Sequence, residues 1–200
     1  MNPHLSYPRD TDQEGQFDPA MPWYSRVAHL FDAIPDGAFI LDVGCNSGGF
    51  GRRLLSLKPH CRVYGVDLAK HFLPLARAKG YGFCWHEAAE SLPLAGNVFE
   101  YVILSEILEH ADDPRACVRE ARRVLRPGGI LLGDVPTAYG RWGYRSLRGH
   151  KWHRRCYRRS TLTRLLESEF QTITVHAEPR WPTRHFLLPQ WQCFKAWGRR

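Results

Sequence analysis

Short apolar runs alternate with amphipathic stretches along this chain, and that alternation predicts an α/β fold. Apolar, β-rich runs with the length of buried parallel strands occur at residues 39–43, 61–67, 82–86, 101–104 and 130–134. Between them, apolar residues recur at helical spacing in segments that begin near residues 50, 72 and 114. Strands that alternate with helices in this way are typical of a doubly wound parallel sheet.

The flanking segments extend this pattern into one domain. Residues 1–22 are rich in Pro, Asp, Gln and Gly and are expected to be flexible, whereas residues 23–34 have helical spacing. Towards the other end, residues 161–170 predict a helix and residues 172–176 alternate as a strand. We therefore expect a flexible N-terminal segment followed by a single domain over residues 23–200, which is long enough for one hydrophobic core.

A glycine-rich loop follows the first predicted strand and indicates a ligand-binding site. It reads D-x-G-C-x-x-G-G from Asp42, and its glycines let the backbone lie close to a ligand. Strand, glycine loop and helix together form the local geometry of a nucleotide-type cofactor site. Asp67 ends the next strand, where a carboxylate can accept hydrogen bonds from ribose hydroxyls. Asp42 would repel a pyrophosphate, so the loop suits a cofactor with cationic groups better than NAD.

These residues resemble the class I S-adenosylmethionine-dependent methyltransferases. The resemblance continues in three further blocks, at residues 90–94, 99–110 and 124–132, and covers roughly residues 36–136. It implies an α/β fold with a doubly wound, seven-stranded, mostly parallel sheet, S-adenosyl-L-methionine as cofactor, and methyl transfer. Asn46 stands where the family usually has Gly, a replacement that Asn tolerates because it accepts a positive φ. Ala88 stands where many members have Asp, so Glu87 or the backbone is expected to face the adenine.

The resemblance also implies a set of cofactor-binding residues. Asp42 is expected near the methionine amino group, and Asp67 at the ribose. The backbone of the others is expected to approach the cofactor, or their side chains to flank it: Gly44 and Asn46 in the loop, Leu68, Ala89 and Glu90 around the adenine, and Ser105 near the methionine end.

His110 is the first catalytic candidate, because ligands of a doubly wound sheet lie beyond the carboxyl ends of its strands. A sulfonium methyl is already activated, so a base is needed only for a nucleophile that holds its proton, and His suits neutral pH. His110 follows Glu106 by four residues, which would place both on one helical face. Alternatively, His110 locks the loop with Glu106 as partner. Glu106, Glu109 and His110 are too few ligands within one turn to predict a metal, so none is expected.

His153 is the second catalytic candidate and lies in a basic loop before the helix at residues 161–170. In a smaller set of the resembling enzymes, a loop with His and an aromatic residue covers the acceptor. The alternative is a solvated basic loop.

Positive charge is concentrated in the C-terminal third of the chain. Residues 1–134 carry 14 Lys and Arg against 17 Asp and Glu, whereas residues 135–200 carry 14 against 3. Residues 137–160 are therefore predicted to be a basic aromatic lid that recognises a small anionic acceptor, linked to a glycan, lipid or nucleotide. Two alternatives stay open: residues 141–159 bind RNA, with Arg on phosphates and aromatic rings on bases, or the domain binds the cofactor without catalysis.

Two further expectations concern the surroundings of the protein. The six cysteines are scattered without a C-x-x-C pair, and no leader or apolar run of 18 residues is visible, so a reduced, cytoplasmic protein is expected. The resembling enzymes end in an antiparallel pair, which makes residues 192–197 the last strand. Alternatively, apolar residues between 187 and 197 form one face of a helix that lies on a membrane surface.

Overall fold

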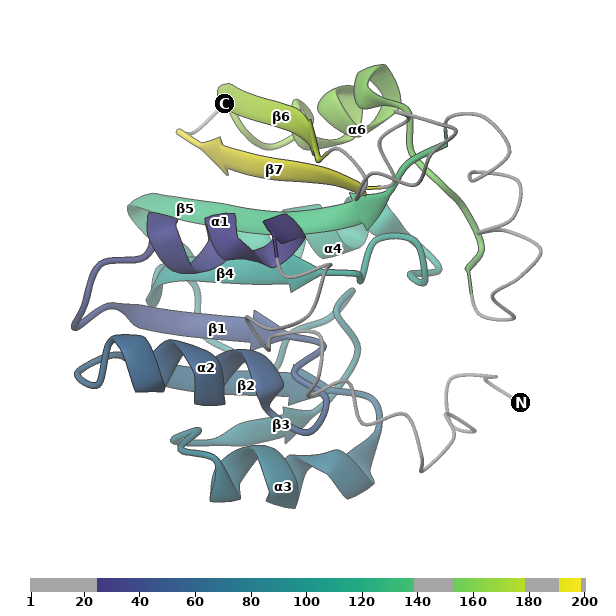
Figure 1. Ribbon diagram of the computed structural model, residues 1–200. Coiled ribbons are helices and arrows are strands. Elements are labelled where there is room, and N and C mark those ends of the chain that lie inside the picture. The colour runs from purple at the N-terminus through teal and green to yellow at the C-terminus, as the bar shows by residue number, and fades with distance from the viewer. Residues whose placement is uncertain (1–24, 139–152, 179–190, 199–200) are drawn as a thin grey trace, which may run out of the picture.

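The computed structural model describes residues 25–138, 153–178 and 191–198. Its centre is a seven-stranded sheet in the order β3-β2-β1-β4-β5-β7-β6, in which β1 to β5 are parallel and β7 is antiparallel to both of its neighbours (Figure 1). The strands are β1 Phe39–Val43, β2 Arg62–Asp67, β3 Cys84–His86, β4 Phe99–Ser105, β5 Leu125–Pro136, β6 Thr172–Glu178 and β7 Trp191–Trp197. The predicted fold class is confirmed.

Helices cover both faces of this sheet. They are α1 Ser25–Ala33, α2 Gly49–Leu57, a 3-10 turn η3 Lys70–Phe72, α3 Leu73–Ala78, α4 Pro114–Val124 and α6 Arg159–Leu166. The apolar sides of α1, α2 and α3 form one core layer with Ile40, while α4 and α6 form the other with Leu41 (Figure 1). Because successive strand residues point to opposite faces and both faces are covered, β1 needs the continuous apolar run seen in the sequence.

Local sequence signals account for two helix starts. Asp113 caps α4, because its Oδ1 accepts hydrogen bonds from the backbone N–H of Arg115 at 2.9 Å and of Ala116 at 3.2 Å, and Pro114 occupies the first turn. Pro74 lies in the first turn of α3, after a separate 3-10 turn. The helix therefore begins late enough for this proline to remove no helical hydrogen bond.

β5 begins at Leu125, earlier than the strand predicted at residues 130–134. Phe99 pairs with Leu125 and Tyr101 with Ile130, so the Arg-Pro-Gly-Gly stretch forms an irregularity inside the strand. Gly128 adopts a φ of +79° there, and the local bend replaces a free turn.

The C-terminal stretch is a strand over Trp191–Trp197, and the surface-helix alternative is wrong for these residues. β7 is paired on both sides, with β5 and with β6, and its Cys193, Phe194 and Ala196 are buried. Because β7 lies between two strands, its apolar side chains are buried within the protein, whereas the alternative helix would have placed them against a membrane. No helix in the described part of the chain is both long and apolar enough to cross a membrane. The predicted N-terminal segment, residues 1–22, lies outside the described residues, as does most of the predicted lid.

Candidate cofactor and acceptor site

A cavity of about 570 Å³ opens beyond the carboxyl ends of β1, β2 and β4. This edge is where ligands of doubly wound sheets bind, and the volume falls in the range of small-molecule sites. The cavity is lined by His110 and by all of the residues expected to bind the cofactor: Asp42, Gly44, Asn46, Asp67, Leu68, Ala89, Glu90 and Ser105. His153 is absent from the lining.

The loop after β1 is held in a conformation that depends on particular residues. The N–H groups of Gly44 and Cys45 both donate to the carbonyl of Val66, at 2.7 and 3.1 Å, which ties the loop to the end of β2. Gly44 has a φ of +80°, and a Cβ there would lie 2.0 Å from Cδ1 of Ile107. Asn46 has a φ of +46°, which confirms that it takes the left-handed conformation of the glycine that it replaces. Ile107, on the loop after β4, therefore packs closely against the backbone of Gly44.

Asp67 links the loop to the turn that follows β2. Its Oδ2 accepts from the N–H of Asn46 and its Oδ1 from the N–H of Ala69, each at 2.7 Å. Burial raises the pKa of Asp67, whereas these two backbone donors lower it. Each carboxylate oxygen has two lone pairs, so a bound group with two hydroxyls can still donate one hydrogen bond to each oxygen.

Asp42 also lines the cavity and is buried, with 4% of its surface exposed. The hydroxyl of Tyr81 donates to Asp42 Oδ2 at 2.5 Å and accepts from the N–H of Gly51, in the first turn of α2, at 3.0 Å. Burial raises the pKa of Asp42 to about 7, the Tyr81 hydrogen bond opposes this rise, and the charge of Asp67 adds to it. Tyr81 thus connects the acid of the first strand to the helix that follows the loop.

The side of the cavity expected to hold the adenine is formed by the loop after β3. Leu68, Ala88 and Ala89 contribute apolar surface, and Glu87 accepts from the N–H of Ala88 at 3.0 Å. Glu90 Oε1 accepts from the N–H of Asp112 at 2.9 Å, which fastens this loop to the one after β4. The two loops therefore frame the cavity together.

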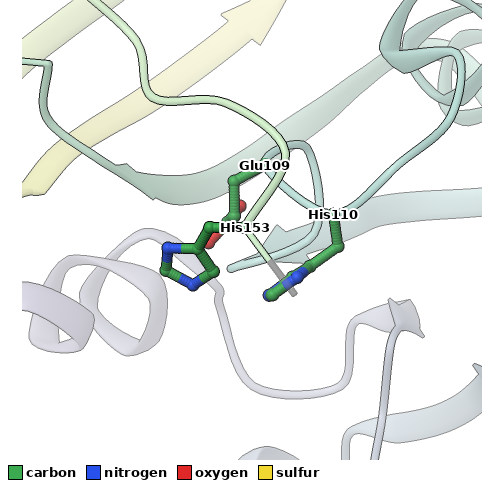
Figure 2. Close-up of side chains that lie close together, drawn as sticks. All are labelled: Glu109, His110 and His153. Carbon is green, nitrogen blue, oxygen red and sulfur yellow. The ribbon is translucent and has the colours of Figure 1, made fainter. Parts of the chain in front are cut away.

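The segment after β4 is a turn, and the predicted helical face shared by Glu106 and His110 is wrong. Glu106 has a φ of +52°, which interrupts any helix, and the N–H of His110 donates to the carbonyl of Ile107 at 3.0 Å. At the strand end, Ser105 Oγ donates to Oδ1 of the buried Asp134 at 2.6 Å. The turn directs His110 into the cavity and towards His153, with ring centroids 4.8 Å apart at 71° (Figure 2).

The segment of residues 153–157 is fastened along the turn after β4. The N–H of Arg154 donates to the carbonyl of Glu109 at 2.9 Å, and the Tyr157 hydroxyl donates to the carbonyl of Leu108 at 3.0 Å. The Arg155 guanidinium donates to the carbonyls of Leu108 and Ala111. Tyr157 also pairs with the end of β5, since its N–H donates to Pro136 at 3.2 Å and its carbonyl accepts from Ala138 at 2.7 Å. His153 is thereby brought beside His110.

Two contributors to the site were missed in the sequence, and a third was recognised only in part. Tyr81 follows the end of a helix and Ile107 lies in an apolar stretch, so neither carries a local signal. Glu109 was grouped in the sequence with Glu106 and His110, but its full burial and its proximity to His153 could not be predicted. All three become visible through contacts between segments that are distant in sequence.

Residues 41–133 match the family model described as a methyltransferase domain. The chain is 38% identical over 101 residues to a ubiquinone biosynthesis O-methyltransferase of Dinoroseobacter shibae, and 38% identical over 96 residues to a malonyl-[acyl-carrier protein] O-methyltransferase of Hahella chejuensis. These alignments cover 48% and 46% of this chain, but only 40% and 34% of the two relatives.

A solved structure of an S-adenosylmethionine-dependent methyltransferase from Thermotoga maritima shares the fold. Its TM-score is 0.70 at 19% identity, with 86% of this chain and 87% of the other covered. Over residues 41–133 the chain therefore matches a methyltransferase domain, and its fold is that of the class I S-adenosylmethionine-dependent methyltransferases. The cofactor of this family is S-adenosyl-L-methionine.

Proposed function

We propose that this protein transfers a methyl group from S-adenosyl-L-methionine to an oxygen or nitrogen of a small anionic acceptor. One observation carries the proposal. A single cavity is lined at one end by the glycine loop and Asp67, and at the other by Ser105 and His110. One cavity with both a nucleoside-type end and an end that carries an imidazole can hold the two reactants of a group transfer side by side.

The residues present fit the cofactor. The Asp67 oxygens each retain a lone pair for a ribose hydroxyl, and Leu68, Ala88 and Ala89 offer an apolar slot for the adenine. Asp42 supplies a buried carboxylate towards a cationic amino group, and Gly44 contributes to the lining of the cavity.

The protein contributes mainly by holding the two reactants together. S-adenosyl-L-methionine supplies a methyl group that its sulfonium has already activated. Positioning of a nucleophile in line with such a group can lower a barrier by up to about 7–11 kcal/mol. Ser105 and the turn after β4 form the wall of the cavity at this end. There, we expect His110 Nδ1 or Nε2 to accept the proton of the acceptor, or to hold the acceptor by a hydrogen bond.

The anionic character of the acceptor is supported by charge and by the relatives. The segment between β5 and α6 is rich in Arg, and arginine forks bind carboxylates and phosphates in bidentate fashion. The malonyl group named for one relative is itself a carboxylate. We propose that residues 137–160 form the lid over such a glycan-, lipid- or nucleotide-linked acceptor, with His153 contributing from its edge.

The proposal is tested by transfer of label from the methyl group of tritiated S-adenosyl-L-methionine into cell extract. We expect label in an organic-soluble or small polar fraction, with no transfer by the Asp67→Ala variant. Label in RNA instead would support the alternative that the basic segment binds nucleic acid. Cofactor binding without transfer to any fraction would indicate a non-catalytic domain and overturn the proposal.

A further inference from the structure

Glu109, His110 and His153 form a compact group, of which His110 lines the cavity (Figure 2). Their ligand atoms, one carboxylate oxygen and two ring nitrogens, all lie within 4.8 Å of one another. Glu109 and His110 are neighbours on the turn after β4, whereas His153 comes from the segment before α6. Two elements that are distant in the sequence therefore supply the group.

Backbone contacts fix this arrangement. The Arg154 N–H bonds the carbonyl of Glu109, and the carbonyl of Leu108 accepts from both Arg155 and Tyr157. The residues flanking the three side chains are thus fastened on both elements. A ligand set held in place before binding loses little entropy when it binds.

The donor set has a recognisable chemistry. One carboxylate and two imidazoles, with a remaining open position, are the ligands that zinc takes in catalytic sites. A buried carboxylate is also favourable only when a cation or several donors neutralise it, and Glu109 has none of its surface exposed.

To bind one metal ion, the three ligand atoms would have to move only slightly closer together. Ligand bonds of about 2.0–2.2 Å to a tetrahedral metal place the ligand atoms about 3.4 Å apart. The largest separation in the group is 4.8 Å, a difference that side-chain rotations of the half-buried His110 and His153 can absorb.

We propose that Glu109, His110 and His153 bind one divalent cation of the zinc class. Its open position would face the cavity, because His110 itself lines the cavity. This role rests on the proposed function: the cation would hold an anionic oxygen of the acceptor, and His110 would then act as a metal ligand in place of a base. The expectation of no metal site is revised accordingly.

The test uses full-length protein without a histidine tag, stripped with a chelator and titrated with Co²⁺, whose visible absorption reports its ligands. We expect one Co²⁺ per chain with the intense bands of a tetrahedral site, displaced by Zn²⁺. His153→Ala and His110→Ala should each weaken binding by more than the about 10–100-fold lost with outer-shell partners. The control is His60→Ala, because His60 is exposed and pairs with Asp36 far from the cavity.

Two outcomes would overturn the proposal: no stoichiometric Co²⁺ binding by the wild-type protein, or binding that His110→Ala and His153→Ala leave unchanged. Since both histidines are only half-buried, these variants are expected to fold, which their circular dichroism spectra verify. Calorimetry with S-adenosylhomocysteine on the same metal-free samples separates this proposal from the methyltransferase proposal. Failure to bind S-adenosylhomocysteine counts against methyl transfer, while metal binding is judged by the cobalt spectrum alone.

Discussion

The hydroxyl of Tyr81 donates a 2.5 Å hydrogen bond to the buried carboxylate of Asp42, although the two residues are 39 positions apart. The same hydroxyl accepts from the N–H of Gly51 and so reaches the first turn of α2. A hydrogen bond to a charged group in a dry environment is stronger than one at the surface. Tyr81 therefore stabilises the glycine loop from outside the lining of the cavity.

Removal of this hydroxyl should loosen the loop. We expect Tyr81→Phe to cost about 1–3 kcal/mol of unfolding free energy, because a buried carboxylate loses its donor. For a chain of this length the melting temperature should fall by about 2–4 °C per kcal/mol, and affinity for S-adenosylhomocysteine should fall as well. Tyr64→Phe is the matched control, since the Tyr64 ring packs against Phe39 and Phe99. Equal melting temperatures of the two variants in differential scanning calorimetry would refute the bracing role.

Cofactor affinity should depend on pH around neutrality. The pKa of Asp42 is raised from 3.8 to about 7 by burial, so its carboxylate form becomes populated only as the pH rises through 7. A cofactor with a cationic amino group prefers that form, and affinity should increase from about pH 6 to about pH 8. Calorimetric titration with S-adenosylhomocysteine measures this. Asp42→Asn should flatten the profile, and an unchanged pH profile in that variant would contradict the assignment.

The stability of the unliganded protein should show the opposite trend. Because the folded pKa of Asp42 exceeds the unfolded value, the native state keeps a proton that the unfolded chain releases. This contribution is fully present below about pH 4 and is lost as the pH rises through about 7. Urea denaturation at several pH values should therefore show that Asp42→Asn gains stability relative to wild type as the pH rises. The raised pKa of Asp67 acts in the same direction and remains in both proteins.

Asp67→Ala should abolish binding of S-adenosylhomocysteine, because it removes the acceptors expected at the ribose. It also leaves the N–H groups of Asn46 and Ala69 without their carboxylate, so we expect a melting temperature a few degrees lower. Asp36→Ala serves as the control, since Asp36 bonds the exposed His60 away from the cavity. Unaltered affinity in Asp67→Ala would remove the ribose assignment.

The contact between the glycine loop and Ile107 can be tested with a double-mutant cycle. Gly44→Ala places a methyl group 2.0 Å from Ile107 Cδ1 and forces Ala to a φ of +80°, so both stability and cofactor affinity should fall. Ile107→Val removes Cδ1, and in the double variant it should recover part of the loss. The residual deficit should be about 1–2 kcal/mol, the cost of the left-handed conformation. Strictly additive effects would show that the two residues do not interact.

Most of the fold could be predicted from the sequence because its signals are local. The run at residues 39–43 is apolar on both faces of its strand since helices cover both faces, and Asp113-Pro114 carries its own capping chemistry. The glycine loop could be recognised for the same reason. The start of β5 could not, because Leu125 joins the sheet through its pairing with Phe99, which Arg-Pro-Gly-Gly does not encode.

The acceptor end was harder to predict because it is built from contacts between distant segments. His110 and His153 were each considered singly in the sequence. They are far apart along the chain, and no local sequence pattern predicts the contact between their rings. The prediction that Glu106 and His110 share one face of a helix was wrong, because the positive φ of Glu106 interrupts the helix. Similarly, the partner of Asp42 lies on a different element, so its raised pKa depends on tertiary burial.

The backbone pairing between Tyr157 and the end of β5 marks a point at which the intervening segment of the chain could be replaced by another. Ala138 and Tyr157 are hydrogen-bonded neighbours, so the described residues that precede and follow the intervening stretch lie side by side here. Closing a longer excursion costs only about 0.6 kcal/mol for each doubling of length. Under the proposed lid role, exchange of the stretch between Ala138 and Tyr157 would change the acceptor preference and leave the sheet and the glycine loop unaltered.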